Sequence, residues 1–221
     1  MYKSSKRKSS ILTKETLAIC KELSMSLKQN ANVPTNLGWH DLKDVEYYTS
    51  GGNSYIYTAS FNNQPVMIKM IKPEIQDDDI AFLEIDKEMV ILSKLNHPNI
   101  VKLYGAGHNL QGRRFLVLEY LDGGTMQQMI SVRKCKKGRI AFRNFRSKVW
   151  IREALSDAHA IAKAMEYCHT GIDNHIIMHR DLKPDNIGQY LYRTLTIFHL
   201  TFSYYGQVIS LMERLKYLIL D

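Results

Sequence analysis

The sequence predicts an α+β fold in two lobes, a small β-rich lobe followed by a helical one. Alternating β-forming residues surround two tight turns between residues 45 and 71, and apolar residues then recur at helical spacing over 82–95. After Gly123-Gly124 the pattern becomes helical. A chain of 221 residues, 45% of them hydrophobic, is sufficient to build a core. Because ligands favour the seam between structural units, we expect a binding site there.

Residues 1–43 are predicted to form an N-terminal extension. They are rich in Lys, Ser and Asn, with a turn-rich stretch at 30–39 and one short helix expected near 12–27. The basic start lacks the apolar region of a secretory signal. Three cysteines without metal-ligand spacing indicate a reducing compartment. We therefore expect a cytoplasmic location, and the basic extension leaves a nuclear one open.

The small lobe is predicted at residues 44–118. "VEYYTSGGNSYIYTAS" and "PVMIKMI" predict three strands joined by tight turns. "IVKLYGAGH" and "RFLVLEYL" predict a hairpin, which brings the number of strands to five. Between these two groups of strands, one long helix is predicted, which ends at "NHPN". Its apolar residues recur at helical spacing: Phe82, Ile85, Met89, Leu92 and Leu95.

Residues 119–188 are predicted to form a connecting hinge and the start of the helical lobe. One apolar helix face, on a helix that ends near His169, is marked by Leu155, Ala158, Ala162 and Met165. The remaining residues, 189–221, form a divergent apolar tail that could cover this face, with a short helix at its end. The uncharged stretch at 194–212 contains too many polar side chains for a good membrane span.

The formal net charge of +8 is concentrated in two basic clusters, at residues 3–8 and 133–148. Nucleic acid, an anionic membrane or an import receptor would each attract such clusters, and solvated loops are the plainer interpretation. No aromatic-interleaved RNA-binding motif accompanies either cluster. The sequence therefore does not favour nucleic acid or a membrane as a partner, and it predicts no oligomeric state.

The string "HRDLKPDN", residues 179–186, is the strongest motif in the chain. With it, residues 45–188 resemble a eukaryotic protein kinase domain with a Ser/Thr-type catalytic loop. This resemblance implies that Asp181 orients the substrate hydroxyl and accepts its proton, and that Lys183 steadies the transferring phosphate. It also makes Asn186 a ligand of Mg²⁺. Lys183 followed by Pro184 favours a Ser/Thr protein substrate.

The same resemblance assigns an ATP site in the small lobe and the hinge. Lys69, in "VMIK", corresponds to the strand lysine beside the ATP phosphates, and Glu88 to the helix carboxylate that holds it. By the same resemblance Leu118 is the gatekeeper position of the hinge, and the backbone at Glu119 and Leu121 meets the adenine edge. The glycine-rich loop over the phosphates keeps only one glycine of the family pattern, and its positions are Thr49, Gly51, Gly52, Ser54 and Ile56.

The resemblance breaks after Gly188. In the family, an Asp-Phe-Gly motif follows the catalytic loop within about twenty residues. Its aspartate holds the magnesium that bridges the phosphates. Here the only later acids are Glu213 and Asp221. Two explanations account for the missing segment: a truncated or misread coding region, or a shortened pseudokinase that binds nucleotide or partners. A third possibility is a chain that does not fold alone. We predict an ATP- and Mg²⁺-dependent Ser/Thr protein kinase, C-terminally truncated, whose activity in this form is open.

Overall fold

The computed structural model describes residues 33–75, 79–135, 148–170, 176–190, 195–197 and 203–204. The helix expected near residues 12–27, most of the basic cluster at 133–148 and most of the apolar tail lie outside these residues. Within the described part of the chain, no helix combines the length and the apolar character needed to cross a bilayer.

The small lobe is a six-stranded sheet in the order β1-β5-β6-β4-β3-β2. Its strands are β1 (Leu37–Gly38), β2 (Leu42–Ser50), β3 (Ser54–Phe61), β4 (Gln64–Ile71), β5 (Leu103–His108) and β6 (Arg114–Glu119). Neighbouring strands are antiparallel except β1, which pairs in parallel with β5. The five predicted strands are all present. β1 was not predicted, because two residues carry no periodic signal.

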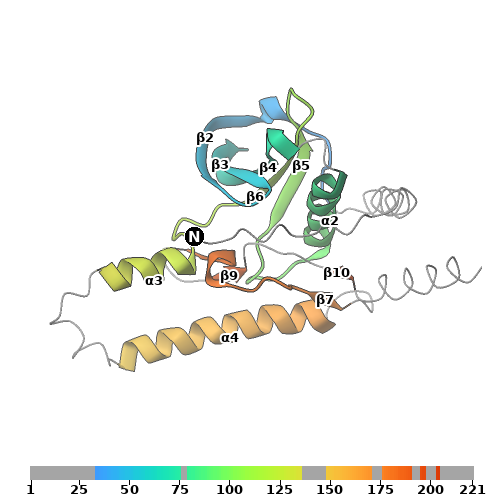
Figure 1. Cartoon of the computed structure of the whole chain (residues 1–221). Coiled ribbons are helices and arrows are strands. Elements are labelled where there is room, and N and C mark those ends of the chain that lie inside the picture. Colours follow the sequence, from blue (N-terminus) through green and yellow to red (C-terminus); the bar gives the residue numbers. More distant parts are fainter. Residues whose placement is uncertain are drawn as a thin grey trace, which may run out of the picture.

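Helix α2 (Asp79–Lys94) lies beside this sheet, and the two faces of the sheet belong to different apolar clusters (Figure 1). Along β4, Met67 and Ile71 join the cluster that contains α2 residues such as Met89. The alternate residues Ile68 and Met70 join the opposite cluster. Because side chains alternate along a strand, Lys69 must project from the face that α2 covers.

Phe115 is the largest fully buried side chain of the cluster opposite α2, and its ring meets Trp39 edge-on at 5.3 Å between centroids. We expect Phe115→Ala to lower the free energy of unfolding by about 3–5 kcal/mol, because the cavity it leaves cannot collapse fully. Urea denaturation followed by circular dichroism measures this change. Leu110→Ala, at a position that is 88% exposed, is the control and should cost under about 0.5 kcal/mol. Equal losses in both variants would contradict the assignment of this core.

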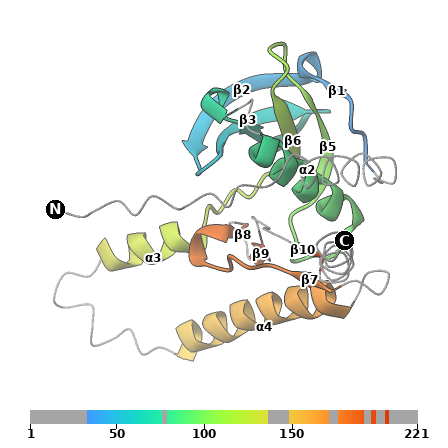
Figure 2. The ribbon, with the colours of Figure 1, turned by 45° about the vertical axis from the view of Figure 1, so that its right-hand side comes forward.

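The described part of the helical lobe contains two longer helices and four short strands, which Figure 2 shows below the sheet. The elements are α3 (Met126–Cys135), α4 (Lys148–Thr170), β7 (Ile177–Met178), β8 (Ile187–Gln189), β9 (Leu195–Ile197) and β10 (Ser203–Tyr204). Three short 3₁₀ helices also occur among the residues described: η1 (Trp39–Asp41) and η2 (Pro73–Ile75) in the sheet lobe, and η3 (Pro184–Asn186) in the helical lobe. β8 pairs with β9 and β7 pairs with β10, so part of the predicted tail continues the fold beyond Gly188.

Helix α4 is present as predicted, and much of its predicted apolar face is exposed. Leu155 is 66% exposed, and Ala158 and Ala162 are also exposed. Among the side chains of α4 that the structure describes, the buried ones are Ala164 and Cys168, which share a core cluster with α2 and the sheet; the predicted Met165 packs against this cluster. The two lobes are therefore joined by continuous apolar packing at this end of α4.

Candidate active site

Lys69 and Glu88 form a buried ion pair between β4 and α2. The Lys69 Nζ lies 2.5 Å from Glu88 Oε2, and the two side chains are 10% and 7% exposed. The pairing follows from the strand alternation described above, because Lys69 faces the helix that carries Glu88. The second carboxylate oxygen, Oε1, is buried and accepts no hydrogen bond within the described residues. The sheet lobe thus holds one lysine ammonium in a fixed position.

The loop after β7 places an acid, an ammonium and an amide together. Lys183 Nζ lies 2.8 Å from Asp181 Oδ2, and Asn186 Nδ2 donates to the same oxygen at 3.0 Å and to the Asp181 carbonyl at 2.7 Å. Asp181 and Lys183 are 43% and 48% exposed, so a macromolecular hydroxyl can reach them. Since the Asn186 nitrogen donates to Asp181, its amide oxygen is the atom that could face a cation.

The backbone of this loop is held by its own hydrogen bonds. The Asp181 N–H donates to the carbonyl of buried His179 at 2.8 Å, and the Asn186 N–H donates to the Lys183 carbonyl at 2.9 Å. Arg180, between His179 and Asp181, has a φ of +59°. A non-glycine residue in this left-handed region costs about 1–2 kcal/mol. Such strain persists where surrounding contacts enforce it, and it clusters at functional sites.

The predicted phosphate loop is the turn between β2 and β3. The Gly51 N–H donates to the Ser54 carbonyl at 2.8 Å, and Thr49 pairs across the ladder with Ile56. Ser54 and Ile56 are buried, whereas Thr49, Gly51 and Gly52 are exposed. A Cβ at Gly51 would meet nothing closer than 3.8 Å, and one at Gly52 would meet nothing within 4 Å. The loop therefore has open space beside its backbone.

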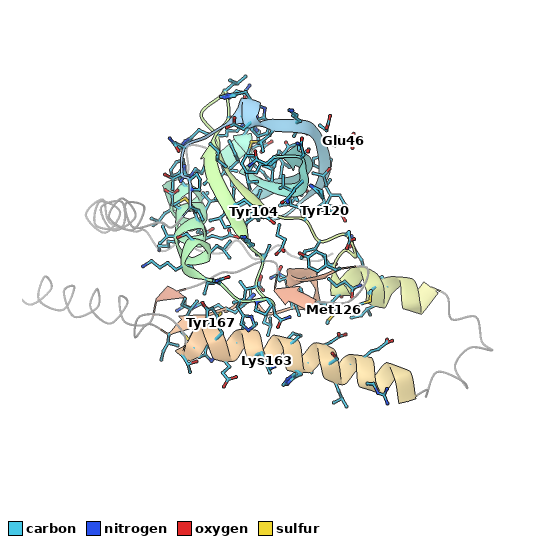
Figure 3. All side chains as sticks on the ribbon, turned by 180° about the vertical axis from the view of Figure 1, so that it is seen from behind. Glu46, Tyr104, Tyr120, Met126, Lys163 and Tyr167 are labelled. Carbon is cyan, nitrogen blue, oxygen red and sulfur yellow. The ribbon has the colours of Figure 1, made fainter. Side chains whose placement is uncertain are left out.

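The predicted hinge runs from the end of β6 into the helical lobe. Leu118 is buried and pairs with Met67 and Leu103, and the Glu119 N–H donates to the Lys102 carbonyl at 2.9 Å. Leu121 is also buried, with its side chain against Gly188 of β8. Tyr120, between these two, lies between the sheet lobe and α3 (Figure 3).

Backbone bonds tie the hinge to the strand that follows the catalytic loop. The Gly123 N–H donates to the Gln189 carbonyl at 2.9 Å, and the Gln189 N–H donates to the Gly124 carbonyl at 3.0 Å. The Tyr190 hydroxyl hydrogen-bonds to Glu119 Oε1. Burial and this carboxylate raise the pKa of Tyr190, which keeps its hydroxyl protonated as the donor. Sequence reasoning missed this connection, because Tyr190 and Glu119 are 71 residues apart and follow no motif.

We expect Tyr190→Phe to lower the free energy of unfolding by about 1 kcal/mol, because the half-buried Glu119 carboxylate loses its hydroxyl donor. Chemical denaturation measures the change. Tyr48→Phe is the matched control, because Tyr48 is 46% exposed on the edge strand β2. If both variants unfold like the unchanged chain, the Tyr190–Glu119 bond does not join the lobes.

The predicted site residues thus fall into two groups and a hinge. Lys69 and Glu88 belong to the sheet lobe, and Asp181, Lys183 and Asn186 belong to the loop that Figures 1 and 2 show between the sheet and α4. No cluster of three or more His, Cys, Asp or Glu side chains suited to a metal occurs within the described residues. Mg²⁺ usually combines one or two protein ligands with substrate phosphates, and the amide oxygen of Asn186 fits that role.

Comparison with known proteins bears on the family of the chain. The family "Protein kinase domain" matches residues 48–189. The chain is 30% identical over 161 residues to serine/threonine-protein kinase VIK of Arabidopsis thaliana, which covers 70% of this chain and 33% of the relative. It is 29% identical over 140 residues to probable serine/threonine-protein kinase PknB of Lactococcus lactis, covering 62% and 20%. Aurora-1 of A. thaliana is 31% identical over 137 residues, covering 62% and 40%. The matches therefore span only a fifth to two fifths of these relatives.

Proposed function

The chain belongs to the protein kinase domain family, and from this premise we propose that it transfers the γ-phosphoryl group of ATP to a serine or threonine hydroxyl of a protein. The observation that carries the proposal is the convergence of two side chains on one oxygen of Asp181: Lys183 Nζ lies 2.8 Å and Asn186 Nδ2 3.0 Å from its Oδ2. The Ser/Thr class rests on Lys183-Pro184 and on the names of the relatives.

In this proposal Asp181 orients the acceptor hydroxyl and takes its proton as the hydroxyl oxygen bonds to the γ-phosphorus. The bond from that phosphorus to the bridging oxygen breaks, and ADP leaves. Lys183, beside Asp181, offsets the negative charge of the transferring group, and Lys69 offsets the charge of the other phosphates. Asn186 is the residue that would hold Mg²⁺, and the bound metal would offset further negative charge on the phosphates.

The direct test uses the whole purified chain. Thermal unfolding should shift upward with ATP, because a ligand that binds only the folded state stabilises it. Radiolabelled phosphate from [γ-³²P]ATP should then appear on serine and threonine in a mixed peptide pool. An upward shift without any labelling would argue against turnover and favour the second candidate below.

That second candidate is a nucleotide-binding protein without turnover. The five residues that join β9 to β10 are Phe-His-Leu-Thr-Phe, and none is acidic. In protein kinases an aspartate after the catalytic loop is a principal ligand of the bridging magnesium. Without it, the metal would depend on Asn186 and the phosphates.

The dissociation constant of ATP measured with Mg²⁺ and with EDTA separates the two candidates. If this chain binds nucleotide without turnover, we expect the two constants to agree within about threefold, because few protein ligands tie the metal to the site. Equilibrium dialysis with labelled ATP measures both constants. An affinity at least about tenfold tighter with Mg²⁺ would show a metal site good enough for the catalytic candidate.

A further inference from the structure

A second buried ion pair lies in the sheet lobe, on the same helix as Glu88. Arg114 at the start of β6 has its Nε 3.1 Å from Oδ1 of Asp86 in α2, and the two side chains are 2% and 3% exposed. Burial lowers the pKa of Arg114, and the neighbouring Asp86 opposes that shift. No step of the proposed transfer uses either charge. Apolar residues of similar volume are often at least as stabilising as a buried ion pair, so stability alone is a weak reason for this one.

The position of Asp86 on the helix indicates a role for this second ion pair. Asp86 and Glu88 are two residues apart, so their side chains leave α2 about 200° apart around its axis. Glu88 meets Lys69 of β4, and Asp86 meets Arg114 of β6. Two ionic anchors in such different directions oppose rotation of the helix, because any turn that stretches one of them also moves the other.

Arg114 makes further contacts with the surroundings of α2. Its Nη2 lies 2.9 Å from the sulfur of Met89, the residue after Glu88. Its Nη1 donates to the Thr35 carbonyl at 3.4 Å, in the segment that leads into β1. The planar guanidinium therefore contacts the helix at two residues and the flanking chain at a third. The planar guanidinium of arginine holds its N–H donors in a fixed geometry, which suits several simultaneous contacts better than the flexible ammonium of lysine.

We propose that Arg114 and Asp86 are positioning residues that fix the rotation of α2 and thereby hold Glu88 against Lys69. Their role in ATP use rests on the proposed function, whereas their effect on Lys69 does not. Loss of the pair would leave Lys69 in the sheet but release it from a fixed carboxylate. Lys69 would then become more accessible to an amine-reactive reagent.

The test measures acetylation of Lys69 by sulfo-N-hydroxysuccinimide acetate, followed by mass spectrometry, in the whole chain without nucleotide. The double variant Arg114→Met/Asp86→Leu removes both charges and should melt no lower than the unchanged chain. We expect its Lys69 acetylation rate to rise at least about fivefold, which corresponds to roughly 1 kcal/mol of lost protection. Val117→Ala, buried on the opposite face of β6, is the control and should lower the melting temperature without raising that rate.

Arg114→Lys gives a second measure that keeps the charge but loses the planar fork, and it should raise Lys69 acetylation by a smaller factor. The proposal is wrong if Lys69 is as protected in the folded variants as in the unchanged chain. It is also wrong if acetylation merely follows the unfolded fraction seen by circular dichroism. ATP binding to the unchanged chain is measured in parallel, to separate the positioning role from the proposed function. If the unchanged chain binds no ATP, the proposed function is refuted and the positioning role is not.

Discussion

An Asp181→Asn chain is expected to transfer phosphate at least about 100-fold more slowly than the unchanged chain, with little change in ATP affinity. The Asp181 carboxylate is partly exposed, lies 2.8 Å from Lys183 Nζ and accepts a hydrogen bond from Asn186. An amide of the same shape keeps much of this packing but cannot accept the hydroxyl proton. The loss should therefore appear in kcat rather than in the binding of ATP.

Initial rates on the best peptide from the mixed pool, together with dialysis of labelled ATP, measure the two quantities. Asp185→Asn is the matched control, because this acid lies in the same loop, in η3, and is exposed. It should retain turnover within about twofold, as surface substitutions usually do. Turnover that survives in the Asp181→Asn chain would place the base elsewhere and remove the main support for the proposed mechanism.

The sheet lobe could be predicted because its signals are local. Alternation along β4 and β6 sorts Lys69, Leu116 and Leu118 onto one face, and the helical spacing after residue 79 supplies the element that covers it. Family resemblance then identified Glu88 as the partner of Lys69. Here local pattern and tertiary packing agree, so the ion pair followed from the sequence.

The remaining features depend on contacts between distant segments. β9 and β10 are three and two residues long, and they exist through pairing with β8 and β7, so the tail sequence alone did not predict them. Arg114 stands at the polar end of an apolar strand, where a charge ordinarily marks a turn. Its burial against Asp86 depends on how α2 crosses the sheet, which no spacing rule encodes.

The Lys69–Glu88 pair gives the other large effect. We expect Glu88→Ala to lower the free energy of unfolding by about 3–5 kcal/mol, because it leaves the Lys69 charge buried without its carboxylate. ATP affinity should also fall at least about tenfold, since a misplaced ammonium loses a charged hydrogen bond to the phosphates. Urea denaturation and dialysis of labelled ATP measure these changes. Lys87→Ala, at an exposed position next to Glu88 on α2, is the control and should alter neither quantity by more than a small amount.

These two effects can be separated within the same pair. The double variant Lys69→Met/Glu88→Leu replaces both charges by apolar groups, so its stability should recover, because no uncompensated charge remains in the core. Its ATP affinity should remain as low as that of Glu88→Ala, because the cation that meets the phosphates is gone. If the double variant instead binds ATP like the unchanged chain, the pair is a structural contact and the nucleotide site lies elsewhere. A variant that is stable but does not bind would show that these two charges serve the ligand rather than the fold.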